Sequence, residues 1–245
     1  GAGGRRFNRM MDKGMRGLLS KAAASGLDLL FPLRCLSCGK EGTLICDPCV
    51  AGLPRLSPPF CAVCAQPISG KGCRRCAEVS LEVDGIRSPF LMEGVIREGV
   101  HSLKYHYVRA AATQLGQLLA EYLMSHPVPG EVMVPVPLHP RRLRSRGYNQ
   151  SALLAWEVSK LTGLPVKENL LVRIKDAPPQ AGVGSREERR RNVAGGFQCV
   201  GDVQNQAVLL VDDVVTTGST MSACAAALKS AGATSVWGLA LAREI

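Results

Sequence analysis

The sequence has few aromatic residues and no long hydrophobic run. Aromatic side chains make up 4% of its 245 residues, whereas 46% of all residues are hydrophobic. Small aliphatic side chains must therefore form most of the core. No apolar stretch approaches the ~20 residues that a membrane-spanning helix requires. The basic N-terminus is followed by a mildly apolar stretch that Asp28 interrupts, which argues against a secretory signal. These absences favour a globular chain with one large domain or two modest ones.

Cysteine, by contrast, is abundant and confined to one region. Eight of the ten cysteines form four CxxC pairs between residues 35 and 76. Without a secretory signal, zinc ligation is a better interpretation than disulfides, because cytosolic thiols stay reduced and thiolates spaced as CxxC bind tetrahedral metal. The simplest assignment is two structural sites filled in sequence order. An interleaved pairing of the first CxxC with the third is also compatible with the spacing. The expected ligands are Cys35, Cys38, Cys46 and Cys49, then Cys61, Cys64, Cys73 and Cys76.

The chain is basic, with a formal net charge of +10. Eight thiolates and two zinc ions would reduce this to about +6. Such a charge either serves solubility or indicates a polyanionic partner.

Three regions follow one another along the chain. Residues 1–31 are basic and contain an expected amphipathic helix over 13–31, which Pro32 stops. Residues 32–80 hold the cysteines among turn-forming residues, so this module needs metal to fold. From residue 81 to 245, strand and helix patterns alternate. This alternation predicts a mostly parallel α/β sheet flanked by helices.

The expected elements of the third region are as follows. Strands are expected at 83–92, 131–137, 170–175, 195–200, 207–213 and 234–242, and helices at 94–105, 109–125, 151–163 and 219–232. The strand at 207–213 is a continuous apolar run, as expected where helices cover both faces of a sheet.

The most informative segment is VLLVDDVVTTGST, residues 208–220. A buried strand runs into two acids, Asp212 and Asp213, at its expected tip, and a small polar loop then opens a helix. A helix N-terminus presents free N–H groups and a positive dipole end to an anion. Two carboxylates beside such a loop suit the paired hydroxyls of a ribose phosphate, or a divalent metal. The loop residues expected to hold the phosphate are Thr216, Thr217, Gly218, Ser219 and Thr220.

A second polar segment, VPVPLHPRRLRSRGYNQ at 134–150, also follows an expected buried strand. Guanidinium groups bind phosphate bidentately, so this loop is a candidate for pyrophosphate or for a nucleic-acid backbone. Lys104 is a further candidate for a phosphate contact. Tyr148 is a candidate for stacking on a base. The expected contacts of the loop are Arg141, Arg142, Arg144, Arg146, Tyr148, Asn149 and Gln150.

A long polar excursion at 176–197 combines proline, glycine and a dense cluster of charges. A loop of this kind in a compact domain is typical of a lid or binding loop. Its expected contacts are Gln180, Arg186, Arg189, Arg190, Arg191 and Asn192.

Together these motifs resemble the ComF (competence protein F) family. The resemblance rests on FPLRCLSCG, the CxxC pairs, PVPLHPRRLRSRGYNQ, the 180–192 segment and VDDVVTTGST. It implies a double zinc ribbon followed by a type I phosphoribosyltransferase-like domain that binds 5-phosphoribosyl-1-pyrophosphate (PRPP) with Mg²⁺. By that resemblance, Asp212 and Asp213 contact the ribose hydroxyls and residues 216–220 hold the 5′-phosphate. The family further implies a cytoplasmic protein at the inner face of the membrane, near the DNA-uptake machinery.

Three functions are compatible with these features. The first is a competence factor that binds PRPP and single-stranded DNA during natural transformation. The second is an active phosphoribosyltransferase in which Asp212 and Asp213 are the catalytic pair. It would transfer phosphoribosyl from PRPP to an unidentified acceptor and release pyrophosphate. The third is a PRPP-sensing regulator without chemistry.

Overall fold

A computed structural model describes residues 33–70, 72–105, 108–174 and 196–245 of the chain. The chain divides into two compact units, residues 1–46 and 47–245. The expected helix at 13–31 and the expected lid residues Gln180, Arg186, Arg189, Arg190, Arg191 and Asn192 lie outside the described residues. In the first unit, Arg34 pairs with Glu41 and the backbone N–H of Leu36 donates to Leu44 O.

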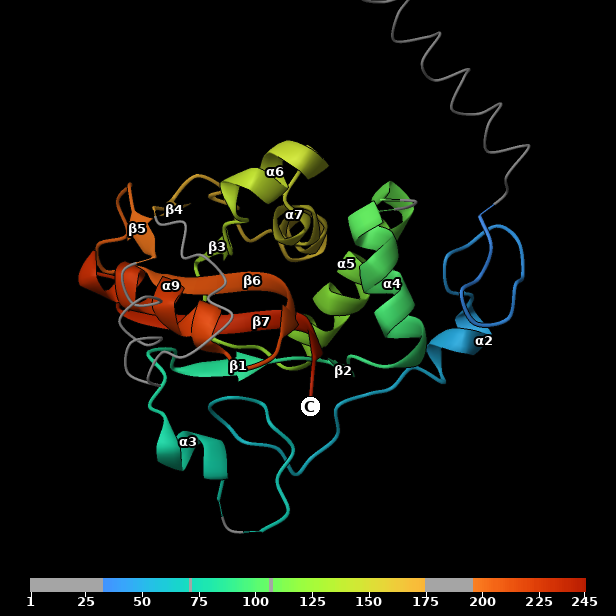
Figure 1. Ribbon diagram of the computed structural model, residues 1–245, viewed down its shortest axis with the longest axis horizontal. Helices are drawn as coiled ribbons and strands as arrows, with labels where there is room; N and C mark the ends of the chain where they lie inside the picture. The colour runs from blue at the N-terminus through green and yellow to red at the C-terminus, as the bar shows by residue number, and fades with distance from the viewer. Residues whose placement is uncertain (1–32, 71, 106–107, 175–195) are drawn as a thin grey trace, which may run out of the picture. The chain divides into compact units, whose positions relative to one another are not determined.

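The second unit is built on a parallel sheet whose strand order is β1-β7-β6-β3, with β2 also paired to β7 (Figure 1). These five strands are β1 (Gly85–Arg87), β2 (Phe90–Leu91), β3 (Val132–Pro135), β6 (Ala207–Val215) and β7 (Ser235–Arg243). The central strand β6 is parallel to both neighbours, with Leu210 opposite Val134 on one side and Gly238 on the other. The expected parallel α/β sheet is therefore present.

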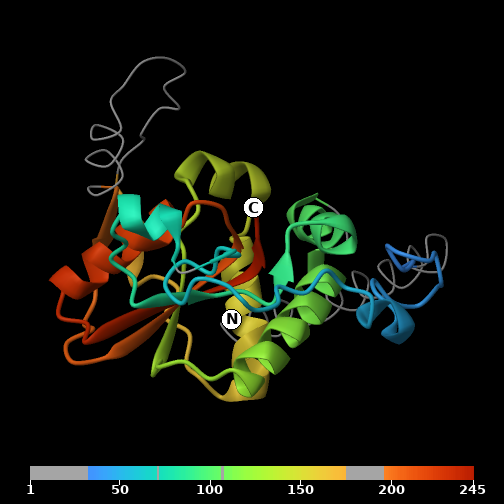
Figure 2. The same cartoon turned by 90° about the horizontal axis from the view of Figure 1, so that it is seen from below.

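Helices cover both faces of this sheet. Figure 2 shows α9 on one side and α4, α5 and α7 on the other. The described helices are α2 (Asp47–Val50), α3 (Arg74–Glu78), α4 (Gly94–Tyr105), α5 (Val108–Ser125), α6 (Pro140–Arg146), α7 (Gln150–Thr162) and α9 (Ser219–Ser230). Because both faces are covered, Val208, Leu209, Leu210 and Val211 of β6 are each at most 1% exposed. Burying each such side chain contributes about 1.5–3 kcal/mol.

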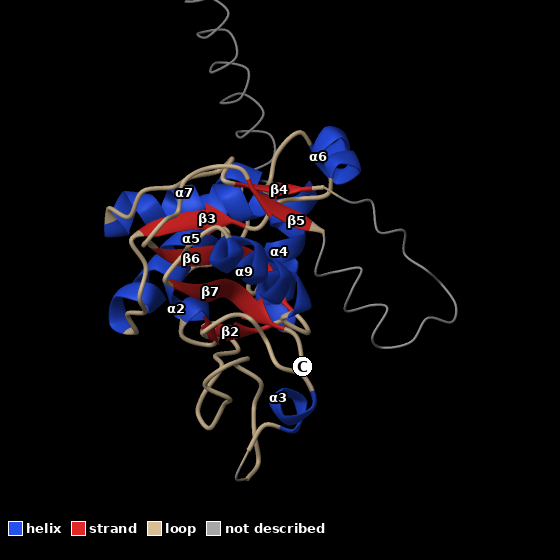
Figure 3. Ribbon diagram, turned by 90° about the vertical axis from the view of Figure 1, so that its left-hand side faces the viewer, coloured by secondary structure: helices blue, strands red, loops and turns tan. Residues whose placement is uncertain are grey.

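Two further strands form a small antiparallel pair apart from the main sheet. They are β4 (Leu171–Arg173) and β5 (Phe197–Cys199), with Val172 opposite Gln198. Figure 3 shows this pair beside the β3 edge of the sheet. The sequence predicted both strands but not their antiparallel pairing with each other.

The segment 134–150, expected as a loop, contains a helix instead. Helix α6 begins with Pro140, whose fixed φ suits the first helical position. The His139 side chain caps it by accepting a hydrogen bond from Arg141 N at 3.1 Å. Gly147, in the left-handed conformation, ends the helix. The prediction of a loop was wrong. This helix has no buried residue, so it is stabilised by its caps rather than by an apolar face.

Candidate phosphate-binding site and metal centres

The loop between β6 and α9 has the geometry of an anion site. Gly218 is the N-cap of α9 with a φ of 73°. A Cβ at Gly218 would approach Ile86 Cδ1 to 3.2 Å and Leu81 Cδ1 to 3.3 Å. Conformation and space therefore both favour glycine here. Thr216, Thr217, Ser219 and Thr220 are exposed around it. Among them, the Thr217 hydroxyl donates to Ser219 Oγ at 2.8 Å.

The acid pair lies inside β6 rather than at its tip, which corrects the sequence-based expectation. The strand continues through Val214 and Val215, which pair with Ala242 and Arg243 of β7. Asp213 is 5% exposed, whereas Asp212 retains some exposed surface. The two carboxylates are thus set back from the loop by two further strand residues.

Three side chains from the helical layer engage these carboxylates. Ser151 Oγ donates to Asp212 Oδ1 at 2.8 Å. Gln150 Nε2 donates to Asp213 Oδ1 at 3.3 Å. Lys104 Nζ lies 2.6 Å from Asp213 Oδ2, an oxygen that has no hydrogen bond of good geometry among the described residues. The sequence offered Lys104 as a candidate for a phosphate contact or as a surface lysine, and in this structure it pairs with Asp213.

The electrostatics of the pair are asymmetric. Burial, and next the neighbouring Asp213 carboxylate, raise the pKa of Asp212 well above its ordinary value of 3.8. The Ser151 hydroxyl and the Asp213 N–H oppose this shift without reversing it. Hydrogen-bond donors and cations would therefore stabilise the negative charge of the acid pair.

Some side chains of the 134–150 segment are exposed, and others contact neighbouring residues of the protein. Arg141, Arg142 and Arg144 are exposed on α6. Arg146 is partly buried: its Nη1 donates to Gln150 Oε1 at 2.5 Å, and its guanidinium lies 5.6 Å from the centre of the Tyr105 ring. Helix α6 follows β3, which ends opposite Val211 of the parallel strand β6. The carboxyl ends of parallel strands meet at one edge of a sheet, which places α6 at the edge of the phosphate loop.

Tyr148 and Asn149 hold the backbone in place. The Tyr148 hydroxyl lies 3.1 Å from Leu103 O and 2.9 Å from Lys104 O, so it fixes the C-terminal end of α4. Asn149 caps α7 by accepting from Ser151 N, and its Nδ2 donates to Val136 O. The aromatic ring that is exposed here is Tyr105, at 62%. The sequence offered no sign of this difference between the two tyrosines.

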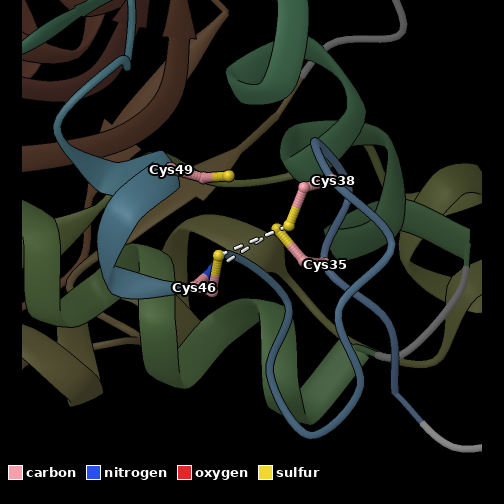
Figure 4. Close-up of side chains that lie close together, drawn as sticks. All are labelled: Cys35, Cys38, Cys46 and Cys49. Carbon is pink, nitrogen blue, oxygen red and sulfur yellow. Dashed lines mark hydrogen bonds between the residues drawn. The ribbon is translucent and has the colours of Figure 1, made fainter.

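The cysteines form two four-sulfur groups in sequence order. Within each group the sulfurs all lie within 4.8 Å of one another. Figure 4 shows the first group. The groups are Cys35, Cys38, Cys46 and Cys49, and Cys61, Cys64, Cys73 and Cys76. The sequential assignment is confirmed, and the interleaved alternative is wrong.

The sulfur geometry fits zinc. The sulfur atoms of Cys38 and Cys46 lie 3.5 Å apart, and those of Cys64 and Cys73 lie 3.6 Å apart. Tetrahedral zinc with bonds of about 2.3 Å requires sulfur separations of about 3.8 Å, whereas a disulfide requires about 2.05 Å. None of the ten cysteines, all of which the structure describes, is in a disulfide. Burial raises the pKa of Cys35, but backbone N–H donors outweigh it and bring the pKa to about 6. The thiolate form of Cys35 is therefore accessible near neutral pH.

Comparisons with known proteins agree with this architecture. Residues 26–80 match the family described as a double zinc ribbon domain, and residues 159–243 match the phosphoribosyl transferase domain. The chain is 38% identical over 117 residues to competence protein F of Haemophilus influenzae, covering 46% of this chain and 51% of that protein. It is 35% identical over 152 residues to the DNA utilization protein YhgH of Salmonella typhi, covering 60% and 66%.

A more distant relative is aligned over more of the chain. Competence protein ComFC of Bacillus subtilis is 25% identical over 209 residues, covering 79% of this chain and 81% of that protein. The matches to the Haemophilus and Salmonella proteins span only about half to two thirds of their lengths.

Solved phosphoribosyltransferase-type structures are also similar. Glutamine PRPP amidotransferase of B. subtilis, complexed with ADP and GMP, matches with a TM-score of 0.38 and 26% identity, over 54% of this chain and 26% of that one. Purine phosphoribosyltransferase of Pyrococcus horikoshii matches with a TM-score of 0.35 and 20% identity, over 56% and 74%. With its paired four-cysteine sites, its type I phosphoribosyltransferase-like sheet and its competence-protein relatives, the chain belongs to the ComF family.

Proposed function

We propose that this protein binds PRPP at the carboxyl end of β6 and single-stranded DNA on the adjoining α6, and that it acts in DNA uptake. The observation that carries the proposal is the succession of acid pair, hydroxyl-rich loop and helix N-terminus between β6 and α9. The names of the relatives, competence protein and DNA utilization protein, support the role in DNA uptake.

In this proposal the loop and the acid pair divide the ligand between them. Residues 216–220 hold the 5′-phosphate with backbone N–H groups and hydroxyls. Asp212 and Asp213 accept hydrogen bonds from the two ribose hydroxyls, and these replace the Ser151 hydroxyl and the Lys104 ammonium as partners. Lys104, once released, lies close enough to neutralise the pyrophosphate. Mg²⁺ would be held chiefly by the pyrophosphate oxygens and would offset their charge.

The DNA surface in this proposal is the exposed face of α6. Arg141, Arg142 and Arg144 are exposed on α6, and guanidinium groups suit a phosphate backbone. Tyr105, exposed beside Arg146, takes the base-stacking role that the sequence had suggested for Tyr148. Among the described residues no helix combines the length and apolar character needed to cross a bilayer. We also propose that the protein acts at the inner face of the membrane, beside the DNA-uptake machinery.

A fluorescence-anisotropy titration of labelled single-stranded DNA tests this function. The titration is run near physiological salt, with and without Mg²⁺–PRPP, and with unlabelled duplex as competitor. We expect single strands to bind preferentially and PRPP to change their affinity, because both ligands approach the same edge of the sheet. Binding no tighter than the ~10⁻⁴–10⁻⁶ M typical of non-specific association would contradict the DNA role.

The same mixtures separate binding from catalysis. Phosphoribosyl transfer would break the bond between C1 of the ribose and the pyrophosphate oxygen and release one pyrophosphate for each acceptor modified. Release that depends on added acceptor would favour the active transferase. PRPP binding without DNA binding and without release would favour a PRPP-sensing regulator.

A further inference from the structure

Arg243 is a fully buried charge at the end of a core strand. It is the last residue of β7 and is 0% exposed. Its Nη1 donates to Cys64 O at 2.8 Å, and its Nη2 donates to Gln66 Oε1 at 2.6 Å. Both acceptors belong to the second four-cysteine module, which is 177 and 179 residues away in sequence. A charged group leaves water only where its surroundings compensate it, so this contact needs an explanation.

A zinc-thiolate centre at Cys61, Cys64, Cys73 and Cys76 would supply this compensation. Arg243 Nε and Arg75 Nε are both buried without a hydrogen-bond partner. Four thiolates and one Zn²⁺ carry a net charge of −2, which two guanidinium groups balance. Arg75 adjoins the ligand Cys76 in sequence, and Arg243 donates to the carbonyl of the ligand Cys64. Both guanidinium groups therefore belong to the surroundings of the second four-cysteine group.

The same residue is joined to the phosphate loop. Arg243 is the register partner of Val215, which immediately precedes Thr216. The N–H of the next residue, Glu244, donates to Val215 O at 2.9 Å. A second contact with the module lies on β1, which pairs with β7. The backbone N–H of Ile86 in β1 donates to Val63 O at 2.8 Å. Ile86 also lies against Gly218 of the loop. Figures 1 and 3 both place the end of the chain between the main sheet and the α3 segment.

We propose that Arg243 anchors the second zinc site to the sheet and positions the Thr216–Thr220 loop through Val215, so that loss of zinc from this site loosens the loop. Arg243 is a positioning residue in this scheme, since it acts on the ligand only through the strand end. The consequence for PRPP rests on the proposed function. The consequences for zinc retention and for loop order do not.

Zinc release tests the anchoring step. The zinc-loaded full chain is challenged with a chromogenic chelator, comparing wild type with Arg243→Met and Gln66→Ala. Outer-shell partners of a metal site typically change affinity about 10- to 100-fold. We expect one of the two zinc equivalents to leave Arg243→Met about 10-fold faster, with a smaller change in Gln66→Ala. Arg97→Met is the control, because Arg97 is exposed and donates to Met92 O. If both Arg243→Met and Gln66→Ala release zinc at the wild-type rate, the proposal is overturned.

Hydrogen exchange tests the positioning step. We expect the amides at 214–220 to exchange faster in Gln66→Ala and in wild type that has lost zinc from the second site. The amide of Leu115 in α5 should keep its protection. Gln66→Ala serves here because it leaves the buried charge in place and is the less disruptive change. Unaltered exchange at 214–220 after zinc loss would overturn the coupling. If wild type does not bind PRPP by calorimetry, the proposed function fails, and the release and exchange results still decide this inference.

Discussion

At the scale of single residues, Asp212 and Asp213 are adjacent but differ in what stabilises them. The pKa of Asp212 is raised, so the folded state holds its proton more tightly than the unfolded chain does. The free energy of unfolding therefore falls as the pH rises above 3.8 through the folded-state pKa. Asp213, by contrast, is paired with Lys104, whose Nζ lies 2.6 Å from Asp213 Oδ2.

This asymmetry predicts opposite effects on stability. Asp212→Asn should raise the free energy of unfolding of the ligand-free protein at neutral pH by about 0.5–2 kcal/mol, because it removes a strained charge at a binding site. Asp213→Asn should lower it by about 1–3 kcal/mol, because it leaves Lys104 without its partner. The 26% exposure of the Lys104 side chain moderates that loss. Urea unfolding at pH 7 measures both, and equal effects of the two variants would contradict the assignment.

Gly218 carries a second prediction at this scale. Gly218→Ala should destabilise the protein by about 1–2 kcal/mol, because an L-residue is disfavoured at its positive φ and the new methyl group would press on Ile86 and Leu81. Gly72→Ala is the matched control, since a Cβ there meets nothing within 4 Å. Thermal unfolding compares the two, and similar melting temperatures would speak against the strained turn.

At the scale of elements, α6 is a separable basic surface. Replacing Arg141, Arg142 and Arg144 with glutamine should reduce the slope of log K against log salt for single-stranded DNA by about 2, because each phosphate contact contributes about 0.7. Lys160→Gln is the control, since Lys160 is exposed on α7 and pairs with Glu157. An anisotropy salt series makes the comparison. A slope that the triple replacement leaves unchanged would place the DNA surface elsewhere.

The elements also show how far a sequence can be interpreted. Helices α4, α5 and α7 were predicted within one residue of their bounds, because each has a local apolar pattern and Gly163 terminates α7. Helix α6 was missed although Pro140 and Gly147 mark its ends. Such caps alone are weak evidence when no apolar stripe accompanies them.

The site was predictable only where it is local in sequence. The loop 216–220 follows directly from a strand–loop–helix pattern. The contacts of Lys104 and Ser151 with the acid pair join residues about 60 to 110 positions apart, as expected of tertiary packing that no local pattern encodes. Arg243 left a faint signal, a charge that ends an otherwise apolar strand, but its partners lie in another module.

At the scale of the whole molecule, the two four-cysteine groups carry a prediction about metal content. Metal analysis should give about two zinc ions per chain, each held by four thiolates. Because cysteine thiols must lose their protons to bind zinc, acidification should release the metal. Atomic absorption on the purified chain measures the number, and a value near one would mean that one group is not a zinc site.

The most direct test of the account is a calorimetric titration of the zinc-loaded protein with Mg²⁺–PRPP, comparing wild type with the Asp212→Asn, Asp213→Asn double variant. The account predicts saturable binding to wild type and none to the double variant, with the zinc content and circular dichroism of both unchanged. Equal PRPP affinity in the two proteins would contradict the assignment of the acid pair and, with it, the proposed site.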